Sequence, residues 1–200
     1  MRTFSLEEGT IAVKVARRVV ESTVLGTDPG EMDIPETFKE PGGVFTTINT
    51  YPSRDLRGCI GYSEPVMPII LAIIRSAKAA ATQDPRFSPL RKEELDRIVV
   101  EVSLLTPPVP LEASAPDEYP RKIKIGKHGL IVHMDGKGGL LLPQVPVELG
   151  WNSHEFLKNI CLKAGLPPDC WRTGRAKLFT FTAEVFEEIT PRGRIVKKDA

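Results

Sequence analysis

Apolar side chains recur every three or four residues in three segments, which predicts three amphipathic helices. The first segment, SLEEGTIAVKVARRVV, carries Ser5 and Glu8 at capping-box spacing, so we expect a helix from there to about Gly26. The second helix is expected to start at Glu64-Pro65 and to end at TQDPRFSPL, where two prolines forbid its continuation. The third is WNSHEFLKNICLKAGL, with Ser153 as its N-cap and Gly165 as its stop.

Alternating or continuously apolar runs predict the strands. GVFTTINT and LRGCIGY, joined by YPSRD, are expected to be antiparallel neighbours, and IVVEVSLL is the strongest strand in the chain. HGLIVHMD and GLLLPQV, joined through DGKGG, have the pattern of a hairpin, and KLFTFTAEVFEEI is a half-buried closing strand. Residues 27–43 form a proline- and glycine-rich loop, and the proline-rich stretch 106–120 is a candidate hinge. Because helices and strands mix without regular βαβ repeats, the predicted class is α+β with antiparallel sheets.

Composition describes an ordinary globular chain. The 200 residues are 41% hydrophobic and 26% charged, with a formal net charge of +1 and no block of basic residues. Nucleic acid is therefore an unlikely partner, since affinity for it depends on clustered cations. The absence of a long apolar run and of a signal-peptide pattern at the N-terminus favours a cytoplasmic protein without a membrane segment.

The three cysteines are Cys59, Cys161 and Cys170, an odd number at wide spacing. This pattern argues against a disulfide framework and against a zinc site, and in a reducing cytoplasm all three thiols are expected to be free. Cys161 completes an apolar helical stripe and is expected to be a core residue, whereas Cys170 lies in a loop without a partner pattern. We expect no metal and no cofactor.

LRGCIGY, residues 56–62, places two glycines around one cysteine in a predicted strand. Alternation sends Arg57, Cys59 and Gly61 to the face opposite the apolar side chains, and glycines in a strand often permit a close approach. An adjacent guanidinium would favour the thiolate and lower the pKa of the cysteine, as a nucleophilic or redox thiol requires. The structural alternative is that Cys59 is a small buried residue and that the glycines allow tight packing.

Glu101 is the most conspicuous candidate acid or base, because it sits in the middle of the apolar strand IVVEVSLL. A covered carboxylate needs a partner or has a raised pKa, so Glu101 either forms a salt bridge with Arg57 or Arg86 or does acid–base work. His128 and His133 are candidate bases for a thiol, although each of them is also compatible with an ordinary surface histidine.

The motifs LRGCIG, DPRF, EVSLL, HGLIV, LLPQV and FLKNICLKAGL, in this order and spacing, resemble the AMMECR-domain family. The similarity extends from about Gly43 to Trp171 and is that of an archaeal- or bacterial-type single-domain member. It implies two subdomains with antiparallel sheets flanked by helices, the larger formed by about residues 1–107 and 173–200 and the smaller by about 108–172. LRGCIG is implied to face a cleft between them.

Motif by motif, the resemblance implies a site of ten residues but no reaction. Cys59, Glu101 and His128 are the candidate catalytic residues. The candidate binding residues are Arg57, Gly58, Gly61, Asp84, Arg86, Gln144 and Glu148.

Two functions fit these residues. One is a thiol-dependent enzyme acting in the cleft on a large or peptide-like substrate. The other is a non-catalytic protein-binding or adaptor module that uses the same cleft. Association within the family suggests Memo-like or radical-SAM proteins as partners.

Overall fold

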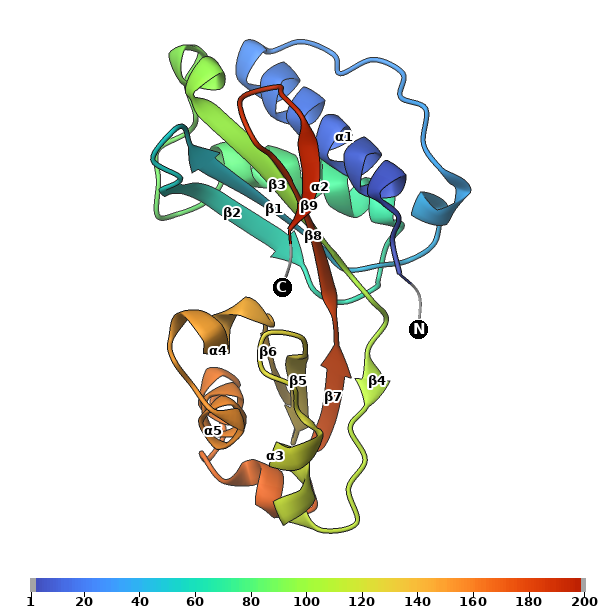
Figure 1. Ribbon diagram of the computed structural model, residues 1–200, viewed down its shortest axis with the longest axis vertical. Helices are drawn as coiled ribbons and strands as arrows, with labels where there is room; N and C mark the ends of the chain where they lie inside the picture. Colours follow the sequence, from blue (N-terminus) through green and yellow to red (C-terminus); the bar gives the residue numbers. More distant parts are fainter. Residues whose placement is uncertain (1–2, 199–200) are drawn as a thin grey trace. The chain divides into compact units, whose positions relative to one another are not determined.

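A computed structural model describes residues 3–198 of the chain (Figure 1). It divides into two compact units, one made of residues 3–105 and 184–198 and the other of residues 106–183. Residues 173–183, which we expected in the larger subdomain, belong to the second unit because the strand β7 (Lys177–Phe181) pairs there with two neighbours. Two antiparallel sheets with flanking helices confirm the predicted α+β class.

The first unit is built on a five-stranded sheet with the order β2-β1-β3-β8-β9. Helices α1 and α2 pack against one face of this sheet, as Figure 1 shows, and share with it a continuous apolar core. The opposite face is called the outer face below. The elements are α1 (Leu6–Leu25), η1 (Glu36–Lys39), β1 (Val44–Thr50), β2 (Leu56–Tyr62), α2 (Ile69–Thr82), η2 (Lys92–Arg97), β3 (Ile98–Leu105), β8 (Ala183–Glu188) and β9 (Ile195–Lys198).

Helix α1 begins and ends where the sequence predicts. The Ser5 side chain accepts from the N–H of Glu8, whose carboxylate in turn accepts from the N–H of Ser5, and Gly26 ends the helix in the left-handed conformation. Helix α2 starts at Ile69, later than predicted from Glu64-Pro65. The reason is Pro68, which favours an extended residue before it and therefore delays the helix until the chain has passed it.

The second unit contains a four-stranded sheet with the order β4-β7-β5-β6, covered by α5 over a separate apolar core. Strands β5 and β6 form the predicted hairpin, and Asp135 and Gly136 in the turn between them both have positive φ. The elements of this unit are β4 (Val109–Pro110), η3 (Pro116–Glu118), α3 (Tyr119–Lys122), β5 (Gly129–Met134), β6 (Lys137–Leu141), α4 (Gln144–Glu148), α5 (Ser153–Lys163), η4 (Cys170–Arg172) and β7.

Three predictions in this unit are wrong. GLLLPQV is not strand throughout, because Pro143 has no N–H for a ladder and α4 follows it. The N-cap of α5 is Asn152 instead of Ser153, since the Asn152 side chain accepts from two backbone N–H groups. KLFTFTAEVFEEI is divided between the two sheets at Thr182, whose backbone pairs with Thr106.

Cys161 and Cys170 are joined in a disulfide with a Cα–Cα distance of 6.3 Å, so the prediction of three free thiols is wrong. Both residues are buried, and the bond ties the end of α5 to η4. The spacing could not reveal this pair, because Cys161 on its helix and Cys170 in its loop are brought together only by packing. Among residues 3–198, Cys59 is the free cysteine. The described part of the chain also contains no helix with the length and apolarity needed to span a bilayer.

Candidate functional site

LRGCIGY forms β2, an edge strand whose single neighbour in the sheet is β1. The predicted alternation is confirmed from Gly58 to Tyr62, because Ile60 and Tyr62 pack against the apolar core of the unit. It is wrong for Leu56, which is exposed because the register with β1 shifts between Ile48 and Asn49. Gly58 lies on the same side as Ile60, where a Cβ would sit 2.2 Å from the carbonyl oxygen of Ala80 in α2. Gly58 is therefore required for α2 to pack closely on the strand.

Gly61 lies on the outer face with Cys59, and the need for a glycine here is also explained by a contact within the protein. A Cβ at this position would sit 2.2 Å from the ring of Phe45, the residue opposite Gly61 on β1. The ring covers the glycine across the strand pair. Gly58 and Gly61 were predicted to bind a ligand, but both are explained by contacts within the protein.

Asp84 and Arg86 of the DPRF motif bind the backbone of Cys59. The Asp84 carboxylate accepts from the N–H of Cys59 at 2.8 Å, and the Arg86 guanidinium donates to the carbonyl of Cys59 at 3.3 Å. Arg86 also donates to both oxygens of Asp84, at 2.9 and 2.7 Å. We call this pair the Asp84–Arg86 clamp. It occupies the backbone groups that a further strand would otherwise pair with, so it protects the edge of the sheet.

Asp84 is buried, and hydrogen bonds from Arg86, more than its coulombic attraction, hold the pKa of its carboxyl far below the ordinary value. Burial opposes this shift but does not outweigh it. The clamp is therefore a fixed ion pair at neutral pH.

Arg57 does not face the thiol as we predicted. Its Nε and one terminal nitrogen donate to the two oxygens of Glu94 at 2.7 and 3.1 Å, and this bidentate bond lowers the pKa of Glu94. The guanidinium also lies over the ring of Phe87, 5.9 Å from the centroid, and the Arg86 guanidinium lies 5.5 Å from the same centroid. Arg57 thus holds η2 and Phe87 against β2.

Cys59, Thr47 and Glu101 form a row across three strands of the outer face, because Thr47 is in register with both of the others. The Thr47 hydroxyl donates to Sγ of Cys59 at 3.3 Å, and the ammonium of Lys198 on β9 donates to the buried carboxylate of Glu101 at 3.0 Å. We call these four residues the Cys59 row. Glu101 has the salt bridge that its burial requires, although its partner is Lys198 and not Arg57 or Arg86.

Burial raises the pKa of the Cys59 thiol above its ordinary value, and the negative charges of Glu101 and Asp84 act in the same direction. The hydrogen bond from Thr47 and the charge of Arg86 oppose this change without reversing it. The prediction that a neighbouring arginine activates the thiolate is therefore wrong. Cys59 is a protonated thiol at neutral pH.

His128, Gln144 and Glu148 belong to the second unit. Nδ1 of His128 accepts from the N–H of Lys124 at 3.3 Å, and burial, aided by Lys124 and Lys127, lowers the pKa of the imidazole. Gln144 and Glu148 are the first and last residues of α4. The convergence of these three residues with Cys59, and the cleft that would contain them, stay predictions of the family resemblance.

His133, the other candidate base, packs edge-on against Phe179 on the second sheet. No cluster of three or more His, Cys, Asp or Glu side chains within residues 3–198 has an arrangement that could hold a metal ion.

Thr47 and Lys198 are the members of the row that sequence reasoning missed. Alternation in GVFTTINT does place Thr47 and Phe45 on one face, so the signal for Thr47 existed once β1 and β2 were paired. Lys198 carried no such signal, because a lysine near a chain end is ordinary and only the position of β9 brings it to Glu101.

The fold and the site define a two-unit α+β protein with an LRGCIG edge strand whose backbone is bonded by the DPRF turn. The AMMECR1 family profile matches residues 13–186, and the chain belongs to this family. Protein MJ0810 of Methanocaldococcus jannaschii is 52% identical over 198 residues, which cover 99% of this chain and 98% of that protein. A protein of Methanococcus aeolicus is 48% identical, with 99% and 100% covered.

Among solved structures, the crystal structure of Uncharacterized Protein PH0010 from Pyrococcus horikoshii superposes with a TM-score of 0.85. It is 50% identical to this chain, and the match covers 97% of this chain and 98% of the other. The family resemblance inferred from the motifs is confirmed, and the family assigns a fold without assigning an activity.

Proposed function

We propose that this protein is a non-catalytic binding module, in which the Cys59 row on the outer face holds a segment of a partner protein. The observation that carries the proposal is the state of Cys59, which is protonated, half-buried and hydrogen-bonded to the Thr47 hydroxyl. A nucleophilic cysteine needs thiolate character or an adjacent base. The neighbouring Glu101 is already paired with Lys198.

The chemistry of the row suits a peptide. The Lys198 ammonium has N–H donors beyond the one that bonds Glu101, and the Thr47 hydroxyl, whose hydrogen is given to Cys59, can still accept, so the row can bond the C=O and N–H groups that any peptide presents. The open backbone of β2 is a poorer docking point, because the Asp84–Arg86 clamp already occupies the N–H and C=O of Cys59. Recognition by side chains on the sheet face is therefore favoured over addition of a strand to the sheet edge.

The family resemblance suggests a partner and a compartment. Memo-like and radical-SAM proteins are the first partners to test, because members of the family are associated with them. We propose a cytoplasmic location. The buried disulfide is compatible with it, since intracellular proteins of hyperthermophilic archaea retain such bonds and the relatives above are archaeal.

The first experiment measures alkylation of Cys59 by iodoacetamide as a function of pH in the native protein. Cys59→Ser supplies the baseline, and the other two cysteines do not react with iodoacetamide because they are joined in the disulfide. We expect slower reaction at pH 7 than for a free thiol of pKa ~8.5, with the increase displaced to higher pH. Rapid alkylation at pH 7 would contradict the binding module and favour the thiol-dependent enzyme.

The second experiment measures the affinity of a purified Memo-like protein by calorimetry. Cys59→Ser should leave the dissociation constant nearly unchanged, whereas Thr47→Arg, which fills the row, should weaken binding by about tenfold or more. Leu71→Arg is the matched control, because Leu71 is exposed on α2, away from the outer face. Loss of binding in Cys59→Ser with retention in Thr47→Arg would refute the proposal.

A further inference from the structure

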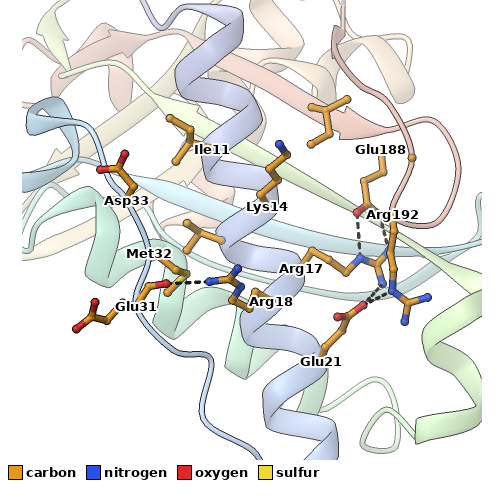
Figure 2. A pocket seen from close by; sticks show the side chains of 13 residues that line it. Ile11, Lys14, Arg17, Arg18, Glu21, Glu31, Met32, Asp33, Glu188 and Arg192 are labelled. Atoms are coloured by element: carbon orange, nitrogen blue, oxygen red, sulfur yellow. Dashed lines mark hydrogen bonds and ion pairs between the residues drawn. The ribbon is translucent and has the colours of Figure 1, made fainter.

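A concave site lies in the first unit, along the solvent side of α1 (Figure 2). It encloses about 480 Å³ between α1, the loop around residues 31–33 and the turn that joins β8 to β9. This volume falls within the range of small-molecule sites. We call it the α1 groove. It is separate from the Cys59 row, because α1 covers the other face of the sheet from the one that carries Cys59.

One end of the α1 groove consists of charges that are already paired. Arg17 is buried and donates to both oxygens of Glu188, and Arg192 bonds Glu21 and Asp96 (Figure 2 shows the pairs with Glu188 and Glu21). These pairs join α1 to β8 and to the turn after it. They are the fixed frame of the groove and are not available to a ligand.

Four charged groups of the α1 groove have no such partner. The ammonium of Lys14 and the carboxylates of Glu31 and Asp33 form no ion pair or hydrogen bond within residues 3–198. Arg18 donates one bond, to the backbone carbonyl of Glu31 at 2.9 Å. Lys14 and Arg18 lie one turn apart on α1, a spacing at which two like charges destabilise a helix unless an anion lies near them.

The walls of the α1 groove therefore carry opposite charges. Lys14 and Arg18 stand on α1 and Asp33 stands on the loop, whereas the Glu31 side chain extends from the loop away from α1 (Figure 2). Between them, Ile11, Met32 and Ile195 are half-buried and present apolar surface continuous with the core.

We propose that the α1 groove binds a small zwitterion with an apolar side chain, either a free amino acid or a short peptide. Lys14 and Arg18 bind the carboxylate, which relieves the repulsion between them. Asp33 on the loop binds the ammonium group. Ile11, Met32 and Ile195 contact the side chain, so an aliphatic ligand binds more tightly than a polar one of the same charge.

The test is a titration of the isotope-labelled full chain, followed by the backbone amide signals in two-dimensional NMR. Leucine and the dipeptide Leu-Leu are added separately at millimolar concentration. We expect shifts in residues 11–18, 31–33 and 193–195. Shifts with leucine identify a free amino acid as the ligand, and shifts with the dipeptide alone identify a peptide.

Variants and blocked ligands test the assigned contacts. Lys14→Glu should weaken binding about tenfold or more, while Lys78→Glu, on an exposed position of α2, should not change it. Asp33 lies on a surface loop, so Asp33→Asn should keep the fold. The substitution should weaken the binding of leucine but not that of N-acetyl-leucine, which lacks the ammonium group. The proposal is overturned if neither ligand shifts the signals, if Lys14→Glu binds as the parent does, or if N-acetyl-leucine and leucinamide bind the parent as tightly as leucine.

Discussion

At the scale of single residues, the two glycines of LRGCIG make room for different neighbours. Gly58 lets a helix carbonyl approach the inner side of β2, and Gly61 leaves room for the ring of Phe45 on the outer side. Cys59, between them, has its backbone fixed by the Asp84–Arg86 clamp and its thiol fixed by Thr47. The motif is thus largely explained by the packing of an edge strand.

Gly58→Ala should lower the free energy of unfolding by about 1–3 kcal/mol, because the added methyl group meets a backbone oxygen that cannot move without shifting α2. Urea denaturation at neutral pH measures the change. Leu56→Ala in the same strand is the control, since Leu56 is exposed and its loss should cost less than about 0.5 kcal/mol. Equal stabilities for the two variants would contradict the close approach of α2.

Asp84→Asn should lower the free energy of unfolding by about 1.5–3 kcal/mol at pH 7, because it breaks the charged bonds to Arg86 and to the backbone of Cys59. The pKa of the Asp84 carboxyl is lower in the folded state than the ~3.9 of an unfolded chain. The stabilisation by the Asp84 carboxylate is therefore complete above the pKa of the unfolded state. It is lost as the pH falls through the lower pKa of the folded state. The parent and the variant should converge below about pH 4 in urea titrations, and a constant difference down to pH 2 would contradict this.

At the scale of elements, the edge of the first sheet and the end of α5 are each secured by a small number of contacts. The Asp84–Arg86 clamp lies at the end of α2 and satisfies β2 in place of a further strand. The Cys161–Cys170 bond joins α5 to η4 within the second core, where Trp171 packs beside it.

Cys170→Ser should lower the free energy of unfolding by about 2–3 kcal/mol, as expected for opening a short covalent loop. Thermal unfolding with and without dithiothreitol measures this loss of stability. The reductant should lower the unfolding temperature of the parent but not that of the variant. Cys59→Ser should keep the full response to the reductant, because Cys59 is outside the bond. Insensitivity of the parent under unfolding conditions would show that the bond does not form.

At the scale of the whole molecule, the chain leaves the first unit after residue 105 and returns to it at residue 184. The second unit is therefore one continuous segment with its own core, whereas the first depends on β8 and β9 from the end of the chain. Arg17 shows this dependence, because its buried partner Glu188 belongs to β8.

A fragment of residues 106–183 should consequently fold alone, with dispersed amide signals in NMR and a cooperative thermal transition. A fragment of residues 3–105 should not, since it leaves β3 without its neighbour β8 and the Arg17 charge without Glu188. A folded 3–105 fragment, or an unfolded 106–183 fragment, would show that the units are not separable in this way.

The sequence by itself determined most local structure and the family. Ser5 with Glu8 located the start of α1, alternation divided residues 58–62 into two faces, and the DGKGG turn identified the second-unit hairpin, because each signal depends on residues close together in the chain. The motifs also identified the family that the comparisons confirm.

Only the tertiary structure decided which distant residues meet. It assigned Arg57 to Glu94, Glu101 to Lys198 and Cys161 to Cys170, and it raised the pKa of Cys59 where the local sequence predicted a lower one. It also explained both glycines of LRGCIG by contacts with Ala80 and Phe45. The physical reason is that ion pairing, desolvation and close packing depend on distances in space, and these are set by how the strands and helices assemble.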